Sequence, residues 1–250
     1  MQHHTGPLEN TTALITGGAR RIGAEITRGL HGAGMNVVIH YRSSKDEATA
    51  LQKELNKARN GSAHLLQADL LALDTLQGLC EQAHGVWGRL DALINNASAF
   101  YPTPVNEATE ADWNEIVGVN LKVPFFLAQC AIPYLREVRG TIINIADIHA
   151  ERPLKDYVLY STAKAGLIML TKALAKDLAP DIRVNGISPG AFIWPEGISE
   201  AAKTQIVSRT LLKRQGRPAE LASAVVFLIR DADYITGQVI TIDGGQTLTP

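Results

Sequence analysis

TALITGGARRIG, residues 12–23, is the stretch that decides the fold. An apolar, β-branched run ends at glycines, and residues 22–31 then show the spacing of an amphipathic helix. Glycines at such a turn let the backbone approach a pyrophosphate, and the helix N-terminus offers free amide groups to an anion. Any tight strand–helix turn can use glycines, but the first such turn of an alternating chain is where a dinucleotide is expected. The stretch therefore predicts a dinucleotide-binding loop, with contacts from Thr16, Gly17, Arg20, Arg21 and Ile22.

Short apolar runs alternate with longer helical stretches from this loop to the end of the chain. Such alternation predicts right-handed crossovers and a parallel sheet covered by helices on both faces. Because the chain has no internal repeat or linker-like segment, residues 1–250 are expected to form a single α/β domain, a doubly wound Rossmann fold. Strands are predicted at 12–18, 36–41, 63–70, 90–98, 140–147, 182–190 and 237–245. Helices are predicted at 22–31, 45–59, 73–84, 110–136, 157–178 and 218–230. The fourth helix is expected to be broken or bent near Pro124 and to end around Pro133.

The composition is typical of a soluble globular protein, with 46% hydrophobic and 20% charged residues. A formal net charge of -1 leaves no surplus of cations to neutralise a phosphate backbone, so nucleic acid is not an expected partner. A membrane span requires about 20 mostly apolar residues. The longest apolar runs, such as 121–132, are interrupted by Lys122, Pro124 and Gln129, so no span is predicted.

Other features of the sequence favour a cytoplasmic protein. The first ten residues resemble no signal peptide or presequence and are expected to be flexible. Cys80 and Cys130 lie far apart without CxxC spacing, which is typical of reduced thiols. The histidines form no ligand pattern outside the N-terminal residues, so no metal site is predicted. Residues 191–199 lack strand or helix character and follow a predicted strand, which makes them a candidate substrate loop.

The second predicted strand indicates which dinucleotide is bound. NAD sites end this strand with an acid that binds the ribose, whereas NADP sites need cations for the 2′-phosphate. Here the strand ends in HYRSS, residues 40–44, and no acid occurs before Asp46. An arginine at this point offers a planar fork suited to phosphate, and a solvated basic turn is the alternative reading. The pattern favours NADP(H), with contacts from Tyr41, Arg42 and Ser43.

Tyr160 and Lys164 stand four residues apart and so share one face of the helix predicted at 157–178. An ammonium near a phenol stabilises the phenolate and lowers the tyrosine pKa from its ordinary value of about 10. The spacing alone is a weak signal, since Tyr41 and Lys45 share it in a place without catalytic meaning. The pair is a candidate acid–base centre.

Further motifs stand in order along the chain: Asp69 after the third strand, Asn95-Asn96-Ala97 after the fourth, Asn120 on the long helix, SPG at 188–190 and DGG at 243–245. Together with the glycine loop and the Tyr-x-x-x-Lys pair, they resemble the short-chain dehydrogenase/reductase family over nearly the whole chain. The resemblance implies a single Rossmann domain with a seven-stranded parallel sheet.

The resemblance also implies roles for individual residues. Tyr160 would be the proton donor, and Lys164 would bind the nicotinamide ribose and lower the tyrosine pKa. Asn120 would hold a proton-relay water, and Asp69 would contact the adenine. Further cofactor contacts are implied at Leu70, Asn96, Ala97, Ser98, Pro189 and Gly190.

Three departures from the family pattern narrow the function. Arg21 takes the place of the middle glycine of TGxxxGxG, and Ser98 follows Asn-Asn-Ala where a glycine is usual, with AFYPTP next at 99–104. Asp147 replaces the serine that usually stands thirteen residues before the tyrosine. In these features the chain resembles pteridine reductases and bacterial dihydromonapterin reductases.

By that resemblance, Phe100 would sandwich a flat pterin against the nicotinamide. Ser98 and Arg21 would bind the pterin or the cofactor phosphate, and Tyr157 would lie beside Asp147. Three of these residues have a plainer alternative. Phe100 would be a core side chain, Ser98 a turn residue, and Arg21 a ligand of the cofactor phosphate alone.

The chemistry of Asp147 agrees with this subgroup. A carbonyl reductase uses a serine to orient the substrate oxygen, whereas reduction of a pterin C=N bond needs hydride at carbon and a proton at a ring nitrogen. A carboxylic acid whose pKa is raised by partial desolvation can bind or protonate such a ring. A structural carboxylate that caps the following loop is the alternative.

The leading hypothesis is therefore an NADPH-dependent reductase that converts a dihydropterin to its tetrahydro form. Dihydrobiopterin and dihydromonapterin are the expected substrates, and dihydrofolate is a further candidate. A carbonyl or 3-ketoacyl reductase of the same family is the first alternative, and a non-catalytic NADP-binding sensor is the second. Family resemblance also implies a homotetramer with catalytic-region helices at one interface, which the apolar run 167–170 would allow.

Overall fold

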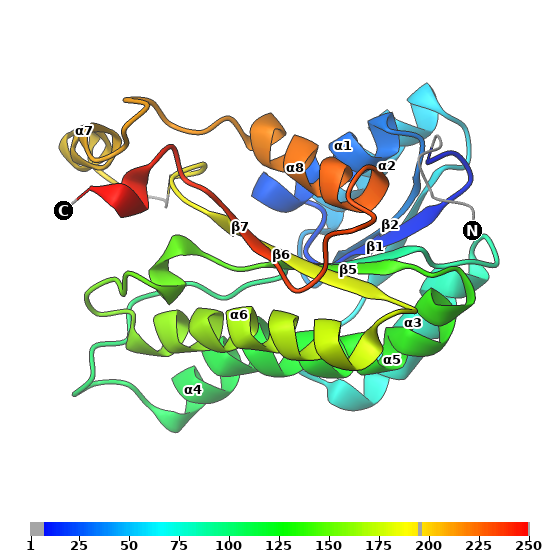
Figure 1. Cartoon of the computed structure of the whole chain (residues 1–250), viewed down its shortest axis with the longest axis horizontal. Helices are drawn as coiled ribbons and strands as arrows, with labels where there is room; N and C mark the ends of the chain where they lie inside the picture. The colour runs from blue at the N-terminus through cyan, green and yellow to red at the C-terminus, as the bar shows by residue number, and fades with distance from the viewer. Residues whose placement is uncertain (1–7, 195–196, 250) are drawn as a thin grey trace.

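The computed structural model describes residues 8–194 and 197–249, and its strands form one parallel sheet (Figure 1). The strand order is β3-β2-β1-β4-β5-β6-β7, which confirms the predicted doubly wound α/β fold. The order reverses between β1 and β4, so the crevice at their carboxyl ends is the switch point where such sheets bind ligands. The strands are β1 (Thr12–Ile15), β2 (Asn36–Tyr41), β3 (Ala63–Gln67), β4 (Ala92–Asn95), β5 (Thr141–Ile145), β6 (Arg183–Pro189) and β7 (Val239–Ile242).

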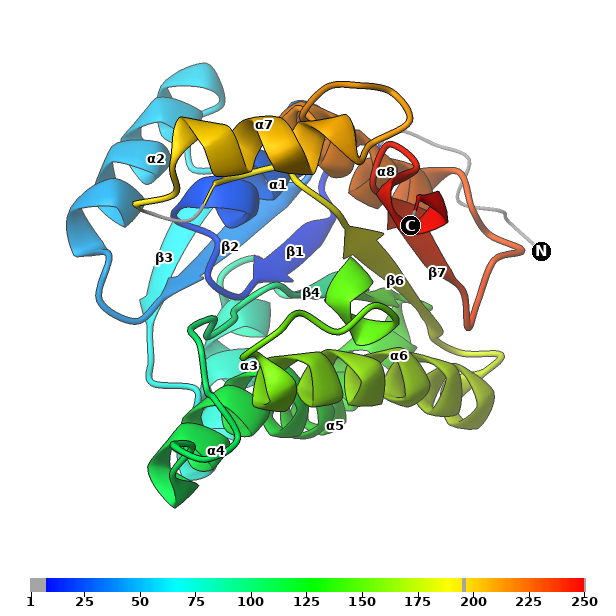
Figure 2. The same cartoon turned by 90° about the vertical axis from the view of Figure 1, so that its left-hand side faces the viewer.

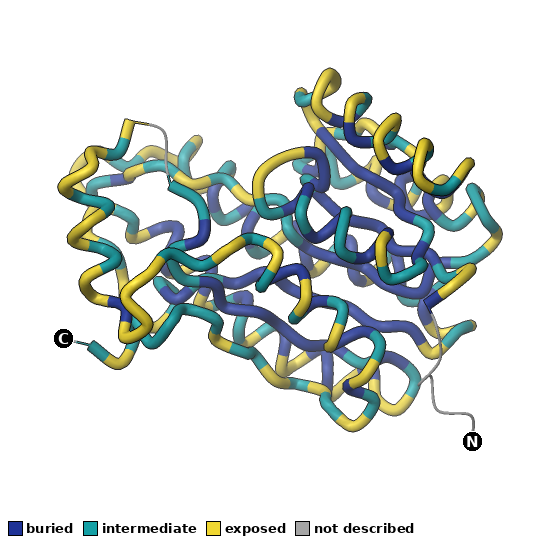
Figure 3. The backbone as a smooth tube through the Cα atoms, turned by 90° about the horizontal axis from the view of Figure 1, so that it is seen from above, coloured by how far each residue is buried: buried dark blue, intermediate teal, exposed yellow. Residues whose placement is uncertain are grey.

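Helices cover both faces of this sheet, as Figures 1 and 2 show. One hydrophobic core lies between the sheet and the layer of α1, α2 and α8, and a second lies under α3, α5 and α6. Figure 3 shows the inner strands buried between these layers, while the edge strand β7 is partly exposed and the outer helices alternate buried and exposed residues. The helices are α1 (Arg21–Gly32), α2 (Lys45–Ala58), α3 (Leu76–Gly85), α4 (Glu110–Val117), α5 (Val123–Glu137), α6 (Val158–Leu178), α7 (Glu200–Ser208) and α8 (Pro218–Arg230).

The long helix predicted at 110–136 is interrupted by a π turn, Gly118–Lys122, between α4 and α5. Pro124 stands in the first turn of α5, where its missing N–H removes no intrahelical bond, so the irregularity precedes it. The expected end around Pro133 is wrong, because α5 continues to Glu137. The apolar face of α5 packs into the second core, and this burial outweighs the one hydrogen bond that the proline removes.

The sequence analysis did not predict α7, which follows the proposed substrate loop. Its N-cap is Ser199, whose Oγ accepts a hydrogen bond from the Ala202 amide at 3.2 Å. None of the α7 residues is buried, so the helix has no apolar stripe that a sequence pattern could reveal. The described parts of the loop at 191–199 contain no strand or helix, as expected, and residues 195–196 lie outside the described part of the chain.

The N-terminal segment agrees only in part with its expectation. The segment 1–10, expected to be flexible, lies mostly outside the described residues, but Leu8 is buried in the first core.

The helical stretch Glu110–Glu137 is long and apolar enough to cross a membrane by length and composition, with a mean hydropathy of 1.5 in its most apolar window. In the fold, 44% of that window is buried, and a core helix of a soluble protein has the same composition.

Candidate active site

The glycine loop is tied to the end of β4 at the switch point of the sheet. Thr16 Oγ1 donates a hydrogen bond to the Ile94 carbonyl at 3.1 Å and accepts from the amides of Asn96 and Ala97 at 2.9 and 3.0 Å. Asn96 Nδ2 returns hydrogen bonds to the carbonyls of Thr16 and Gly17 at 2.8 and 3.1 Å. The structure thus brings together two predicted cofactor segments that are far apart in sequence.

Two glycines of this loop cannot be replaced without moving the backbone. Gly17 has a φ of +59°, in the left-handed region that favours glycine. A Cβ on Gly23 would lie 2.1 Å from the Gly17 carbonyl oxygen and 2.7 Å from Asn96 Nδ2. The close approach leaves a backbone cradle at the start of α1, which fits a bound pyrophosphate.

Arg21 occupies the position where the family pattern has a glycine, and its φ is +53°. A non-glycine residue costs about 1–2 kcal/mol in this region. Such strain persists where the surroundings impose it, commonly at functional sites. The Arg21 guanidinium donates to the Trp194 carbonyl at 3.3 Å, so the glycine loop is linked to the proposed substrate loop.

The predicted phosphate ligands lie at the surface beside the end of β2. Tyr41 is buried, whereas the side chains of Arg42 and Arg20 are 56% and 57% exposed. Arg42 lies 3.9 Å from Glu115, and Arg20 lies 3.4 Å from Glu47. Exposed ion pairs of this kind contribute about 0–1 kcal/mol, so these carboxylates offer weak competition to a phosphate.

The remaining predicted cofactor contacts line the same edge of the sheet. Asp69 accepts a hydrogen bond from the Leu71 amide at 3.0 Å, and Leu70 between them is buried. At the end of β6, the Gly190 amide donates to the Ile242 carbonyl at 2.9 Å, directly after Pro189. Ile22 packs against the first core, and Ser43 is exposed.

Asp147 and Tyr160 form a direct hydrogen bond. The Tyr160 hydroxyl donates to Asp147 Oδ2 at 2.9 Å, and Asp147 Oδ1 accepts from the His149 amide at 2.8 Å. Asp147 therefore caps the short 3-10 turn Ile148–Ala150 with one oxygen and meets the tyrosine with the other. The capping role that was weighed as an alternative is present, and it coexists with the contact to the candidate proton donor.

The pKa of Tyr160 differs from the sequence-based expectation. Burial raises the pKa well above its ordinary value, and the charge and hydrogen bond of Asp147 raise it further, while the nearby Ser98 hydroxyl opposes them. Lys164 was expected to lower this pKa, but burial and the acid beside the phenol raise it. In this arrangement Tyr160 holds its proton.

Lys164 is buried under the tyrosine on the next turn of α6. Its ammonium donates to the Ile145 carbonyl at 2.8 Å and lies 5.6 Å from the centre of the Tyr160 ring. Complete burial lowers the pKa of Lys164 to about 8, against the opposing charge of Asp147. A lysine with this pKa changes its charge within the working range of an enzyme.

Asn120 lies in the π turn and is fully buried. Its Nδ2 donates to the carbonyls of Ile116 and Ala99, each at 2.9 Å, and its Oδ1 accepts from Ser98 Oγ at 2.7 Å. π turns are often found at functional sites. This one aims Asn120 at the segment that carries Ser98, so the amide positions the loop after β4.

Phe100 belongs to an aromatic cluster over the candidate proton donor. Its ring stacks on Tyr157 with a centroid distance of 4.5 Å and an interplanar angle of 22°, and meets Tyr160 edge-on at 4.8 Å. Phe100 is 40% exposed, so it is not an ordinary core residue. A partly exposed aromatic ring therefore lies beside the Asp147–Tyr160 pair.

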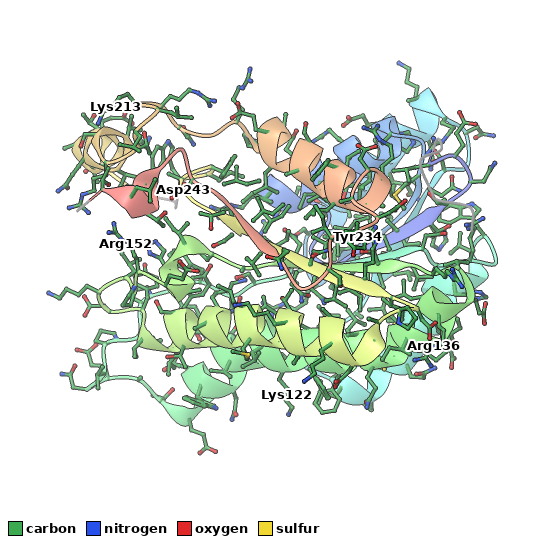
Figure 4. The ribbon with its side chains drawn as sticks, in the orientation of Figure 1. Lys122, Arg136, Arg152, Lys213, Tyr234 and Asp243 are labelled. Carbon is green, nitrogen blue, oxygen red and sulfur yellow. The ribbon has the colours of Figure 1, made fainter. Side chains whose placement is uncertain are left out.

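The chain end approaches the loop that follows Asp147. Arg152 donates to the carbonyls of Gln246 and Thr249, which joins the C-terminal residues to this loop. Figure 4 shows Arg152, Lys213 and Asp243 at the same end of the molecule as α7.

The sequence analysis assigned no role to two polar residues inside the strands, His40 and Asn144. His40 on β2 accepts from the Gly17 amide, while Asn95 donates to Asn144 at 2.8 Å and Asn144 to Thr171 at 2.9 Å. Buried polar residues within apolar strands are the signal that could have found them, since such groups need partners. No group of three metal-binding side chains occurs within the described residues.

The doubly wound sheet, the glycine loop at its switch point and the buried Tyr–Lys pair define a nucleotide-dependent oxidoreductase of the α/β class. A family profile described as enoyl-(acyl carrier protein) reductase matches residues 17–247. The chain belongs to the short-chain dehydrogenase/reductase family, whose members use NADP(H).

Individual relatives match along almost their whole length. Pteridine reductase 1 of Leishmania tarentolae is 34% identical, over 95% of this chain and 96% of that protein. The 3-oxoacyl-[acyl-carrier-protein] reductase FabG of Staphylococcus epidermidis is also 34% identical, over 95% of this chain and 99% of its own. The 3beta-hydroxysteroid dehydrogenase 1 of Eggerthella lenta is 33% identical, over 97% and 96%. The relatives share a reductase or dehydrogenase chemistry and differ in substrate.

The residues present fit NADP(H). The backbone cradle between Gly17 and Gly23 is closed to any side chain and open to a pyrophosphate. Arg42 and Arg20 supply cations for a 2′-phosphate, and no acid follows β2 before Asp46. When bound, the cofactor supplies hydride.

Proposed function

We propose that the protein is an NADPH-dependent pteridine reductase, which converts a dihydropterin such as dihydrobiopterin or dihydromonapterin to its tetrahydro form. The single observation that carries this proposal is the carboxylate of Asp147, hydrogen-bonded at 2.9 Å to Tyr160, where carbonyl reductases of the family have a serine. A carboxyl group can both accept from the amino groups of a pterin and return a proton to a ring nitrogen. A serine hydroxyl cannot replace it as an acid at neutral pH.

Asp147 and Tyr160 act as one proton-sharing unit in this proposal. With Asp147 ionised, loss of the Tyr160 proton would place two anions side by side, which the raised tyrosine pKa reflects. Proton delivery to the substrate therefore depends on both groups of the pair and not on Tyr160 alone. The nearby ammonium of Lys164 stabilises the negative charge that remains after transfer.

Phe100 and Ser98 would hold the substrate. Phe100 is partly exposed beside Tyr160, where a flat heterocycle can stack on its ring. Ser98 lies close enough to Tyr160 to affect its pKa, and its hydroxyl is oriented by Asn120. The link from Arg21 to Trp194 places a cation between the glycine loop and the substrate loop, where it can contact cofactor phosphate or pterin.

A 3-ketoacyl reductase is the second candidate, supported by the equal identity of the Staphylococcus epidermidis relative. Against it stands Asp147 in the serine position. A cytoplasmic homotetramer is also proposed, in which exposed apolar side chains of α4, α5 and α6 would be covered by other subunits. These side chains are Trp113, Phe125 and Met169.

Oxidation of NADPH with a panel of dihydrobiopterin, dihydromonapterin, dihydrofolate, a 3-ketoacyl thioester and simple ketones tests this proposal. A pteridine reductase should show its highest kcat/KM with a dihydropterin. Preference for the ketoacyl substrate would favour the second candidate. NADPH binding without turnover of any substrate would favour a sensor.

A further inference from the structure

His40 bridges the two loops that frame the nucleotide site. The imidazole lies on β2 and is only 2% exposed. The Gly17 amide donates to Nδ1 at 3.2 Å, and Nε2 lies 3.1 Å from the Ala68 carbonyl. An amide N–H can only donate and a carbonyl can only accept, so Nδ1 is bare and Nε2 carries the proton. The geometry therefore selects one neutral tautomer.

Both partners of His40 belong to cofactor-binding segments. Gly17 is the strained first glycine of the pyrophosphate cradle, and Ala68 directly precedes Asp69, the expected adenine contact. Backbone hydrogen bonds support the bridge, because the Gly18 amide donates to the His40 carbonyl at 3.0 Å and the Ala68 amide to the Tyr41 carbonyl at 3.2 Å. The ring adds a side-chain link between the same two segments.

We propose that neutral His40 is a positioning residue for NADP(H), which holds the pyrophosphate loop and the adenine segment in their binding geometry, and that its protonation weakens cofactor binding. Protonated Nδ1 would point a second N–H at the Gly17 amide and leave that amide without an acceptor. Binding of the cofactor would then have to order the glycine loop against the repulsion between these two N–H groups.

The groups around the His40 ring determine the pH at which it is protonated. Burial lowers the pKa of His40, while the Ala68 carbonyl and the carboxylate of Asp69 oppose the shift. On the β1 side the ring meets the backbone amide of Gly17, while the amide of Gly18 donates to the His40 carbonyl. Because the pKa is below its ordinary value of 6.5, the bridge is intact at neutral pH and is lost as the pH falls below that value.

His40→Phe keeps an aromatic ring and removes both hydrogen bonds. We expect it to raise the dissociation constant of NADP+ roughly tenfold or more at pH 7.5, by the cost of an unmade buried bond. His31→Phe is the matched control, because His31 is also buried and hydrogen-bonded, to Ser62 at 2.7 Å, but lies in the last turn of α1, away from the glycine loop. The control should lose thermal stability and keep NADP+ affinity within twofold.

His40→Asn provides the second test, and it applies even where the phenylalanine variant fails to fold. Its amide oxygen can replace Nδ1 as the acceptor for Gly17 but does not titrate. Calorimetric titration with NADP+ from pH 7.5 to 5 should show affinity falling more steeply for the wild type than for His40→Asn. The 2′-phosphate also titrates, near a pKa of about 6, but equally in both proteins. Equal pH dependence in the two proteins, or unchanged affinity in His40→Phe, would overturn the proposal.

Discussion

The hydroxyl of Tyr160 donates a hydrogen bond to Asp147 Oδ2 over 2.9 Å. The two residues come from different elements, since Asp147 follows β5 and Tyr160 lies in the first turn of α6. Burial and this contact raise the pKa of the phenol. Under the proposed function, the carboxylate is part of the proton-transfer centre, at the position where carbonyl reductases of the family have a serine.

The NADP(H) site gives the first prediction. Arg42→Asp should raise the dissociation constant of NADPH roughly tenfold or more, because a charge-assisted hydrogen bond to phosphate is replaced by repulsion. NADH, which lacks the 2′-phosphate, should be affected much less. Fluorescence titration with both cofactors provides the measurement.

Arg136→Asp is the control for that experiment. Arg136 is similarly exposed, pairs with Asp181, and lies at the end of the molecule away from Arg152 and Asp243 in Figure 4. It should leave both affinities unchanged. An Arg42 variant that kept its preference for NADPH would assign phosphate recognition to Arg20 instead.

The aromatic cluster gives the second prediction. Phe100→Ala should raise the KM for a dihydropterin about 2- to 12-fold, the equivalent of a stacking contribution of about 0.5–1.5 kcal/mol. NADPH affinity should change little. Phe227→Ala removes a side chain of similar exposure, 42% against 40%, from α8 and should leave KM unaltered. Loss of folded protein in the Phe100 variant would indicate a core role and refute stacking.

Tyr160→Phe should lower kcat about 10²–10⁴-fold, the usual contribution of an aligned proton donor. Cofactor binding should survive, because the lost hydroxyl acts on the proton and not on the dinucleotide. Stopped-flow measurement of turnover, together with NADPH titration, separates the two effects. Near-normal turnover at saturating pterin would exclude Tyr160 as the donor.

Lys164 gives a prediction about pH. Its pKa is lowered to about 8, and a lysine is charged below its pKa, so kcat/KM should fall as the pH rises through about 8 and the ammonium is lost. Lys164→Arg should lose this alkaline limb, because a guanidinium keeps its charge. Should the arginine variant be inactive, the pH dependence of its NADP+ affinity gives the same comparison. If the arginine variant kept the fall in kcat/KM near pH 8, this pH dependence would belong to a group other than Lys164.

The fold could be predicted from sequence because its signals are local and repeated. Apolar runs end at glycines and alternate with amphipathic helices, so the parallel sheet and α8, at Pro218–Arg230, follow directly. The helix α7 could not be predicted, since it buries none of its residues. The π turn at Gly118–Lys122 also has no sequence period of its own.

The candidate site was predictable as a set of residue types, but its energetics were not. The Tyr-x-x-x-Lys spacing implied a lowered tyrosine pKa, whereas the position of Asp147 relative to Tyr160 depends on how β5 and α6 pack. His40 illustrates the same limit. The position of His40 in an apolar strand predicts that its side chain is buried. Only the fold shows that Gly17 and Ala68 are its hydrogen-bond partners.

Asp147→Asn should lower pterin turnover with a smaller effect on KM, because the amide preserves shape and hydrogen bonding but supplies no acid. Measurement of kcat and KM for both proteins with dihydropterin makes the comparison, and an unchanged kcat in the asparagine variant would remove Asp147 from proton transfer.

Asp147→Ser, assayed with a dihydropterin and a 3-ketoacyl thioester, tests the central claim most directly. The substitution restores the family's usual carbonyl-reductase residue and removes the acid beside Tyr160. We predict a loss of pterin turnover of about 10²–10⁴-fold, with ketoacyl reduction unchanged or increased. A serine variant that reduced dihydropterins as well as the wild type would contradict the account and make the carboxylate a structural cap.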